Sequence, residues 1–305
     1  MTVMEALQWA NDKLKKEKVG DSPMLDAQVL LAHVLSVPKT WLFTHLDQEL
    51  RAHEDDAFQK TVQRRSAHEP VAYITGIRAF YKRDFQVNHF VLLPRPATEI
   101  LVDAAIEASK ASDQDATIFA DIGTGSGAIG VTLAAETQLP VIATDVSKPA
   151  LAVAKGNAEE LGAAELVDLR QGELLEPLVK LFQKISAEGG SASGGKNLPF
   201  KHLILCANLP YLTEVQWEQT EPEVKQFEPK SALVGGADGL DIYWEFSRQL
   251  VRHRAALPKK ITLLFEIDPD QSDRAQKMIR HDFPRSAPRV LKDLEGFDRV
   301  IVAEV

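Results

Sequence analysis

The chain has 305 residues, of which 45% are hydrophobic and 26% charged, as in a folded globular protein with room for one or two domains. Its net charge of −9 argues against broad binding to nucleic acid, which needs clustered lysine and arginine. The single cysteine, Cys206, excludes an intrachain disulfide, and no apolar run approaches the roughly 18 residues that span a membrane. We therefore expect a cytoplasmic protein without a membrane partner, because the first residues also lack a secretory signal.

The amino-terminal part is predicted to be helical. Apolar residues recur at helical spacing in "MEALQWANDKL" and "MLDAQVLLAHVL", and Asp21-Ser22-Pro23 is typical of a helix start. Residues 1–90 contain 12 acidic and 12 basic side chains, so the whole net charge lies in 91–305. This asymmetry indicates two units, the first a helical domain over residues 1–67.

The pattern changes between residues 68 and 95, where we expect a β-hairpin that links two domains. Gly76 and the "KRD" at 82–84 punctuate this stretch. Its β-favouring residues are Val71, Tyr73, Ile74, Phe80, Phe85 and Val87. Two prolines flank Arg95 and predict an extended, stiff segment.

Strands and helices then alternate through the second predicted domain, residues 96–305. The expected strands cover 117–122, 140–145, 165–171, 202–208, 261–267, 287–294 and 298–305. Such βα repeats predict a parallel sheet with helices on both faces. The Gly/Ser-rich run 185–197 interrupts the alternation and is expected to be a disordered surface loop, with a substrate-contacting flap as the alternative.

A glycine-rich loop follows the first of these strands, in "ADIGTGSGAIG". Gly123, Gly125 and Gly127 permit a tight turn and close approach of a ligand to the backbone and to the next helix. Asp145 ends the second strand, where a carboxylate can accept hydrogen bonds from both hydroxyls of a ribose, although it could instead cap the following helix. This pattern fits NAD and S-adenosylmethionine equally.

The motif at the end of the fourth strand, Asn208-Leu209-Pro210-Tyr211, favours S-adenosylmethionine over NAD as the cofactor. Asn208 Oδ1 and the carbonyl of Leu209 or Pro210 can accept the two hydrogens of a planar NH₂ group and aim its lone pair at a methyl donor. Pro210 stiffens the loop, and Tyr211 can lie against the flat substrate group. A dehydrogenase has no evident use for this motif. An ordinary turn is the alternative interpretation, which the upstream loop and Asp145 disfavour.

On these residues the chain resembles the PrmC/HemK family of protein-(glutamine-N5) methyltransferases. The resemblance runs from about residue 22 to the end. Its pieces are "EPVAYITG" (69–76), "LLPRPATE" (92–99), "DIGTGSGAIG" (121–130), "NLPY" (208–211), "FEPKSALVGGADGLD" (227–241), "FEIDPDQ" (265–271) and "DRVIV" (298–302). It implies a helical recognition domain, a hairpin linker and a seven-stranded, Rossmann-like methyltransferase domain. The implied reaction is methylation, from S-adenosylmethionine, of the glutamine amide in the Gly-Gly-Gln loop of peptide chain release factors.

The resemblance also assigns roles to individual residues. The cofactor would be bound by Asp121, Gly123, Thr124, Gly125, Ser126, Gly127, Asp145, Glu173, Leu174 and Asn208. The glutamine would be held by Asn208, Pro210 and Tyr211 as catalytic residues, with Arg95, Pro96, Thr98, Glu99 and Leu209 completing the substrate site.

Four positions depart from the family pattern. Leu209 stands where a proline is usual, which predicts a less rigid loop, and Ala97 replaces an acid. Glu173 replaces an aspartate, and Asp268 replaces a glycine, which puts the local turn in doubt.

Two other functions remain as alternatives. One is an adenine-N6 methyltransferase that acts on RNA or DNA, since Asn-Leu-Pro-Tyr also resembles the motif of ribosomal RNA dimethyladenosine methyltransferases. The acidic carboxyl-terminal part disfavours such a polyanionic substrate. An inactive methyltransferase-like binding module is disfavoured by the intact motifs. No metal is expected, because the eight histidines are scattered and no HExxH or cysteine cluster occurs.

Overall fold

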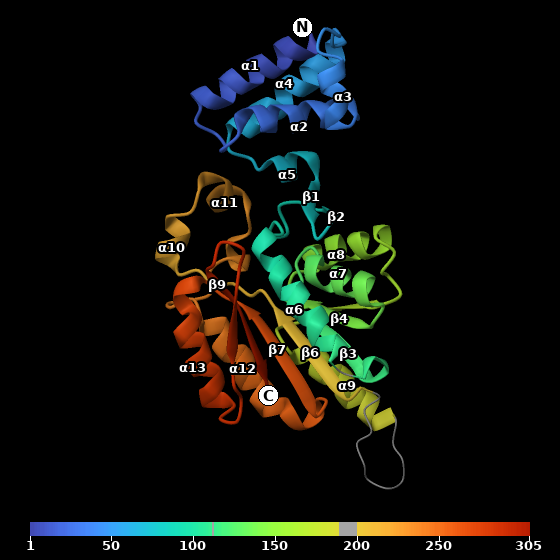
Figure 1. Cartoon of the computed structure of the whole chain (residues 1–305), viewed down its shortest axis with the longest axis vertical. Helices are drawn as coiled ribbons and strands as arrows, with labels where there is room; N and C mark the ends of the chain where they lie inside the picture. Colours follow the sequence, from blue (N-terminus) through green and yellow to red (C-terminus); the bar gives the residue numbers. More distant parts are fainter. Residues whose placement is uncertain (112, 189–199) are drawn as a thin grey trace. The chain divides into compact units, whose positions relative to one another are not determined.

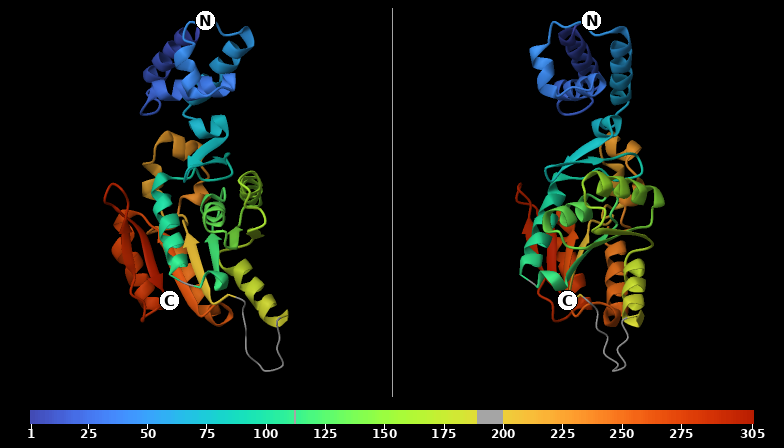
Figure 2. Two further views of the ribbon diagram at one scale, coloured as in Figure 1. Left: turned by 45° about the vertical axis from the view of Figure 1, so that its right-hand side comes forward. Right: turned by 90° about the vertical axis from the view of Figure 1, so that its right-hand side faces the viewer.

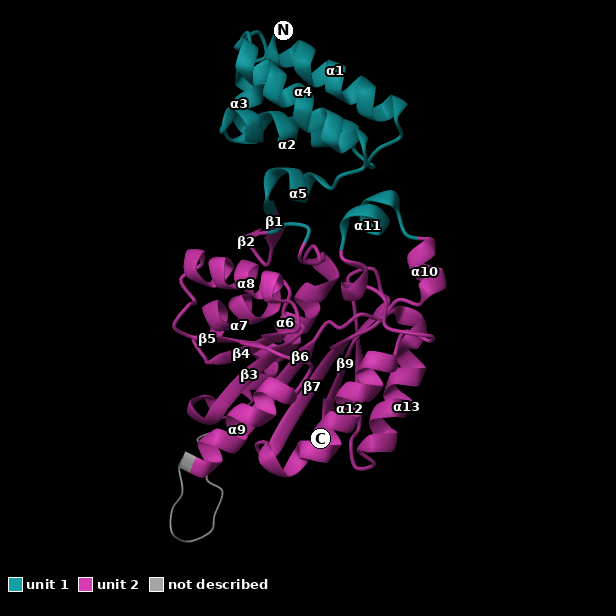
Figure 3. Cartoon of the chain, turned by 180° about the vertical axis from the view of Figure 1, so that it is seen from behind, with its two compact units in different colours: residues 1–77, 87–89, 220–228 teal, residues 78–86, 90–219, 229–305 magenta. Residues whose placement is uncertain are grey.

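The computed structural model describes residues 1–111, 113–188 and 200–305, and the chain in it divides into two compact units. Unit 1 comprises residues 1–77, 87–89 and 220–228, and unit 2 the remainder (Figure 3). Most of the Gly/Ser-rich run 185–197 lies outside the described residues, although its first four residues end a helix. No described helix is long and apolar enough to cross a bilayer.

Unit 1 is a helical bundle. Its helices are α1 (Val3–Lys16), α2 (Pro23–Leu35), α3 (Lys39–Thr44), α4 (Ala52–Ser66), α5 (Val71–Thr75) and α11 (Pro222–Phe227). Apolar faces of α1, α2 and α4 enclose a core that includes Leu14, Leu30 and Phe58, all fully buried. Thr2 and Glu5 form a capping box at the start of α1, which satisfies two backbone N–H groups.

Helix α11 joins unit 1 although it is distant in the chain. The buried guanidinium of Arg65 bridges two carboxylates, at 2.7 Å from Asp26 and 2.6 Å from Glu223. Asp26 belongs to α2 and Glu223 to α11, so this ion-pair cluster ties the inserted segment to the bundle. Charge patterning in the sequence gave no sign of it, because its three members are dispersed.

The hairpin forms, but its first strand begins later than predicted. Residues 71–75 are helical, because Pro70 precedes the helix and Gly76, at φ +76°, ends it in the left-handed conformation. The strands are β1 (Ile77–Phe80) and β2 (Arg83–Gln86), joined by Tyr81 and Lys82. Both connecting residues have positive φ, as in a type I′ turn. Phe80 and Phe85 bury this hairpin against the core of unit 2.

The segment after the hairpin is extended only as far as Arg95. Pro96–Thr98 form a 3₁₀ turn, η1, instead of the predicted stiff extended stretch, because proline is well suited to a first helical position. This turn leads into α6 (Glu99–Lys110).

Unit 2 is a seven-stranded sheet with helices on both faces, as predicted (Figures 1 and 2). Its strands are β3 (Thr117–Ile122), β4 (Val141–Asp145), β5 (Val167–Gln171), β6 (His202–Ala207), β7 (Lys260–Glu266), β8 (Arg289–Lys292) and β9 (Asp298–Glu304). The α-helices are α6, α7 (Ala128–Thr137), α8 (Lys148–Glu160), α9 (Glu176–Glu188), α10 (Glu214–Glu218), α12 (Asp241–His253) and α13 (Ser272–Asp282). Short 3₁₀ turns are η2 (Gln114–Ala116), η3 (Lys230–Ala232), η4 (Arg254–Ala256) and η5 (Pro269–Gln271).

Two apolar layers sandwich the sheet. Helices α6, α7 and α8 contribute to one core, and α9, α12 and α13 to the other. Cys206 lies in the first core and is fully buried, which confirms its prediction as a core residue.

The strand order is β5-β4-β3-β6-β7-β9-β8. The first five are parallel, as the βα repeats predict, but β9 pairs antiparallel with both β7 and β8, so the parallel arrangement does not extend to this edge. The short connection from β8 to β9 explains the antiparallel pairing of these two strands, because parallel neighbours need a long crossover. The order reverses beside β3, between β4 and β6, and ligands of open α/β sheets bind at such a switch point.

Candidate active site

Three segments with predicted site residues follow neighbouring strands at the same edge of the sheet. Ile122 pairs with Thr144 on β4 and with Ala207 on β6, so Gly123, Asp145 and Asn208 emerge side by side. The parallel register therefore brings together the glycine loop, the acid and the amide that the sequence predicted for one site.

The glycine loop adopts a backbone that other residues rarely accept. Gly123, Gly125 and Gly127 have φ of +74°, +55° and +82°. A Cβ at Gly125 would meet no atom within 4 Å, so open space borders the middle of the loop. At Gly123, in contrast, a Cβ would lie 3.0 Å from Leu209 Cδ2, which shows that the glycine loop and the Asn-Leu-Pro-Tyr loop pack on each other.

Asp121 braces the loop from inside. Its Oδ2 accepts hydrogen bonds from Thr124 Oγ1 at 2.6 Å and from the Gly130 N–H at 2.9 Å. Burial raises the pKa of this fully buried carboxyl to about 6. Oδ1 has no hydrogen-bond partner among the described residues. Thr124 and Ser126 are also buried, so these three polar side chains shape the loop; their contact with a cofactor stays a prediction.

Asp145 lies between the loop and the start of α8. Its carboxylate accepts the Gly125 N–H at 2.9 Å and the Ser147 N–H at 2.8 Å, one on each oxygen. Burial raises its pKa. The cap of α8 is Ser147, whose Oγ accepts from Ala150, so capping does not occupy Asp145. Each carboxylate oxygen retains a lone pair for a ligand hydroxyl.

The Asn208 carboxamide is held by the segment before α6. Its Nδ2 donates to Thr98 Oγ1 at 3.2 Å, which leaves Oδ1 available on the opposite side. Thr98 itself is buried. The structure thus joins two residues 110 positions apart that the sequence assigned separately to one substrate site.

Leu209 is buried, and its N–H donates to the hydroxyl of Tyr243 at 3.1 Å. That hydroxyl also donates to the carbonyl of Glu266. A proline at position 209 would have no N–H to donate, so the departure from the family pattern supplies a restraint of its own. Asp268, the other questioned position, caps η5 at an ordinary φ of −68°, so its turn requires no glycine.

Two glycines and one glutamine support Pro210 and Tyr211 from the next segment. A Cβ at Gly235 would lie 2.1 Å from the Pro210 carbonyl oxygen, and one at Gly239 would lie 2.1 Å from that of Tyr211. Gln271 Nε2 donates to the Tyr211 carbonyl at 2.7 Å. Only glycine permits this close backbone approach.

Tyr211 turns its hydroxyl toward the interior, 3.5 Å from Glu266 Oε1. Burial raises the pKa values of both groups, although hydrogen bonding and two arginines favour the ionised Glu266. Glu266 ends β7 directly beside the end of β6, since Phe265 pairs with Ala207. Glu266 is only 1% exposed.

The remaining predicted site residues differ in their exposure and in their contacts. The charge of Arg95 partly opposes the rise that burial causes in the pKa values of Tyr211 and Glu266, whereas Pro96 is exposed. Glu99 Oε1 accepts the Tyr81 N–H at 2.9 Å, which ties it to the hairpin turn. Glu173 is exposed after β5, and Leu174 is buried.

Sequence reasoning gave no individual role to five residues of this site. They are Gly235, Gly239, Tyr243, Glu266 and Gln271. Four of them fall in the quoted motifs "FEPKSALVGGADGLD" and "FEIDPDQ", and Tyr243 follows the first of these. Their motifs were a usable signal, but their contacts are long-range and cannot be read from spacing.

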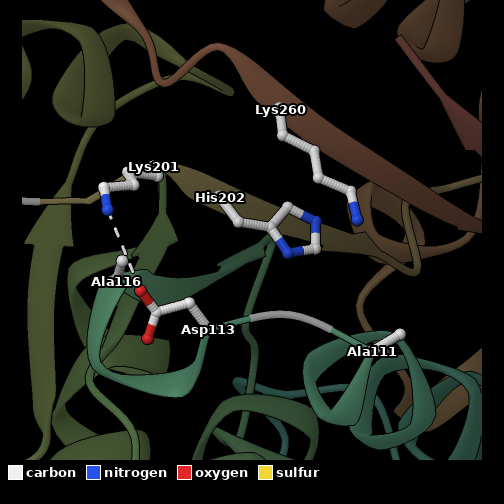
Figure 4. Close-up of a pocket in the computed structure, with 6 residues that line it drawn as sticks. All are labelled: Ala111, Asp113, Ala116, Lys201, His202 and Lys260. Atoms are coloured by element: carbon white, nitrogen blue, oxygen red, sulfur yellow. Dashed lines mark ion pairs between the residues drawn. The ribbon is translucent and has the colours of Figure 1, made fainter.

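A separate cavity of about 280 Å³ lies at the opposite, amino-terminal end of β6 and β7 (Figure 4). His202 projects into it and contacts Thr262 Oγ1 at 2.8 Å through Nε2. Lys201 and Lys260, on its rim, pair with Asp113 and Glu304. This cavity does not belong to the site described above. Within the described ranges, no group of three or more His, Cys, Asp or Glu side chains could hold a metal ion.

The strand order with its antiparallel β9, the glycine loop after β3, the acid after β4 and the Asn-Leu-Pro-Tyr loop after β6 together define a Rossmann-like methyltransferase. The solved hMettl16 catalytic domain in complex with the MAT2A 3′UTR hairpin 6 shares this fold, with a TM-score of 0.50 and 14% identity, over 78% of this chain and 80% of that one.

Comparisons of the sequence identify the family. Residues 5–76 match the PrmC N-terminal domain. The release factor glutamine methyltransferase of Bacillus cereus is 35% identical over 307 residues, which cover 100% of both chains. The protein of the same name from Bacillus subtilis is 35% identical over 305 residues, or 99% of this chain and 97% of that one. The chain belongs to the release factor glutamine methyltransferase family.

Proposed function

We propose that this enzyme transfers a methyl group from S-adenosylmethionine to the side-chain amide nitrogen of a glutamine in peptide chain release factors, specifically that of the Gly-Gly-Gln loop. The observation that carries the proposal is the Asn208 carboxamide at the switch point, with Nδ2 held by Thr98. Its Oδ1 is then the acceptor that a substrate NH₂ requires. Family membership supports the same reaction over adenine methylation.

The residues present fit S-adenosylmethionine. Open space borders Gly125, and the partly buried Asp145 retains lone pairs for ribose hydroxyls. We assign binding to the loop from Gly123 to Gly127 and to Asp145, with Glu173 and Leu174 beyond β5. When bound, the cofactor supplies an electrophilic methyl group.

The chain's own part in the reaction is positioning. Asn208 Oδ1 accepts one amide hydrogen of the substrate, and the carbonyl of Leu209 or Pro210 accepts the other. These two contacts fix the planar nitrogen, and well-aligned intramolecular reactions gain roughly 7 kcal/mol or more from such orientation. As positive charge develops on that nitrogen, the same acceptors stabilise it, and the methylated nitrogen then gives up one proton to water. The restraints on Leu209, Pro210 and Tyr211 keep the acceptors in place before substrate arrives.

We also infer that residues 1–67 help to recognise the release factor, that 68–95 act as a linker and that 96–305 form the catalytic domain. The match of residues 5–76 to the PrmC N-terminal domain supports the first role. Because release factors act on ribosomes, we expect the enzyme in the cytoplasm. The net charge of −9 favours a protein substrate without direct nucleic-acid contact.

A methyl-transfer assay with labelled S-adenosylmethionine tests the proposed function. The substrates are an intact release factor, its Gln→Ala variant in the Gly-Gly-Gln loop, and a structured RNA. We expect label on the intact factor alone. Label on the RNA, or equal label on the Gln→Ala factor, would contradict the proposal.

A further inference from the structure

A carboxamide has two similar ends, and only one of them suits the proposed reaction. If Asn208 presented Nδ2 to the substrate, two NH₂ groups would face each other and no hydrogen bond would form. Some feature of the fold must therefore select the productive orientation, and Asn208 itself cannot do so.

The hydrogen bond between Asn208 and Thr98 selects the productive orientation only if the Thr98 hydroxyl donates its proton to a third group. A threonine hydroxyl has one proton to donate and two lone pairs to accept with. Once that proton is given to another acceptor, the hydroxyl can only accept from Asn208, so Nδ2 faces Thr98 at 3.2 Å and Oδ1 faces away.

Glu266 is that other acceptor. The Thr98 hydroxyl hydrogen-bonds its carboxylate, and the Tyr211 hydroxyl lies 3.5 Å from its Oε1. Burial opposes ionisation of Glu266, whereas the hydrogen bonds from Thr98 and Tyr211 and the charges of two arginines favour it. In its ionised form the carboxylate accepts and never donates, so it fixes the direction of both contacts. The strand register places it there, because Glu266 follows Phe265, the partner of Ala207.

If Glu266 served only to fill space in the core, its burial would lower the stability of the fold. It is 1% exposed, and Oε2 has no hydrogen-bond partner within the part of the chain that the structure describes. A buried carboxylate with an unsatisfied oxygen is expected to reduce stability. Its presence at the reactive end of the sheet is explained if its charge performs a task there.

We propose that Glu266 is a positioning residue that, through the hydroxyl of Thr98, holds the Asn208 carboxamide with Oδ1 toward the substrate amide. This inference rests on the proposed function. The donor sequence runs from Asn208 Nδ2 to Thr98 Oγ1 to the Glu266 carboxylate, and it transfers no proton to the substrate.

Glu266→Gln tests the role of the charge with nearly unchanged shape. Glutamine can donate or accept, so it no longer forces the direction of the Thr98 proton. We expect kcat for release-factor methylation to fall about 10- to 100-fold, the scale of a misoriented catalytic group. The KM for the release factor and the calorimetric affinity for S-adenosylmethionine should change less than about threefold. Thermal stability should be unchanged or higher, whereas a purely structural role for the carboxylate predicts a loss of stability.

A second pair of variants keeps the test decisive should Glu266→Gln fold poorly. Thr98→Val removes the hydroxyl at constant shape, and Thr98→Ser restores it. We expect kcat of the serine variant to exceed that of the valine variant about 10-fold or more. Thr132→Val, which removes a buried hydroxyl from α7, is the matched control and should stay within about twofold of the native kcat. In the double variant Glu266→Gln/Thr98→Val the loss should not exceed the larger single loss, because both break one sequence of contacts.

The outcomes separate this inference from the proposed function. Failure of the native enzyme to methylate the release factor would overturn the function itself. Native activity together with an unchanged kcat in Glu266→Gln, equal kcat in Thr98→Val and Thr98→Ser, or losses that multiply in the double variant would overturn only the role of Glu266.

Discussion

Gly235→Ala should disable the active-site loop through backbone contact alone. The added Cβ would lie 2.1 Å from the Pro210 carbonyl oxygen, 2.7 Å from the Pro210 carbonyl carbon and 2.7 Å from the Gly239 carbonyl oxygen. All three are backbone atoms, so no side-chain rotation relieves the overlap. Increasing the shortest contact from 2.1 Å to 3.0 Å, which Cβ atoms almost never approach more closely, moves one segment by about 0.9 Å.

A shift of this size acts on the group that the proposed mechanism relies on. Misplacement of a catalytic group by about 1 Å can cost on the order of 100-fold in rate, and overpacking typically costs about 1–3 kcal/mol in the free energy of unfolding. We therefore expect kcat to fall about 100-fold in steady-state methylation of a release factor. The affinity for S-adenosylmethionine should fall far less, because the glycine loop and Asp145 lie on other strands.

Gly156→Ala is the matched control for this experiment. A Cβ there would lie 3.6 Å from Gln86 Oε1, an ordinary contact, and the residue lies within α8. Alanine should raise helix stability by up to about 1 kcal/mol and leave kcat unchanged. A Gly235→Ala enzyme that folds and keeps kcat within twofold of the native value would refute the reasoning about the loop.

Three further predictions concern stability. Tyr243→Phe removes the hydroxyl that accepts from the Leu209 N–H and donates to the backbone carbonyl of Glu266, so urea unfolding should show a loss of about 1–3 kcal/mol; a loss below about 0.5 kcal/mol would contradict its bracing role. Arg65→Met leaves the carboxylates of Asp26 and Glu223 without their shared cation and should destabilise unit 1 by about 2 kcal/mol or more in urea unfolding followed by tryptophan fluorescence, with an unchanged midpoint as the contrary result. The pKa of Asp121 is about 6 in the folded protein against 3.8 in an exposed aspartate, so the folded state binds the proton more tightly and this carboxyl lowers stability as pH rises from about 4 to 6. The free energy of unfolding of Asp121→Asn minus that of the native protein should therefore increase between pH 4 and pH 7, and a difference that does not change with pH would contradict the assignment.

Much of unit 2 could be predicted because its signals are local. Continuous apolar runs such as 117–122 and 202–207 form buried parallel strands. Their carboxyl ends place Gly123 and Asn208 at the same edge of the sheet. Because these strands are parallel and in register, their carboxyl ends lie at the same edge of the sheet.

The errors arose where local preference competes with tertiary context. Val71, Tyr73 and Ile74 favour strands, but Pro70 and Gly76 bound a single helical turn whose Ile74 packs into the core of unit 1. The antiparallel edge could not be predicted because the apolar pattern of β9 does not specify which strand it pairs with.

The supporting contacts of the site could not be predicted for a similar reason. Tyr243 meets Leu209 across 34 positions, and Thr98 meets Asn208 across 110. A tyrosine on an amphipathic helix and a glutamate at a strand end look ordinary in sequence. Only the fold shows that both converge on the Asn-Leu-Pro-Tyr loop.

The most direct measurement of the central claim is the single-turnover rate of methyl transfer by Asn208→Ala at saturating S-adenosylmethionine and release factor. Because the Asn208 carboxamide is proposed to hold the substrate amide, we predict a fall of about 100-fold or more, with cofactor binding retained by calorimetry. A single-turnover rate equal to that of the native enzyme would show that another group orients the glutamine, and would contradict the account.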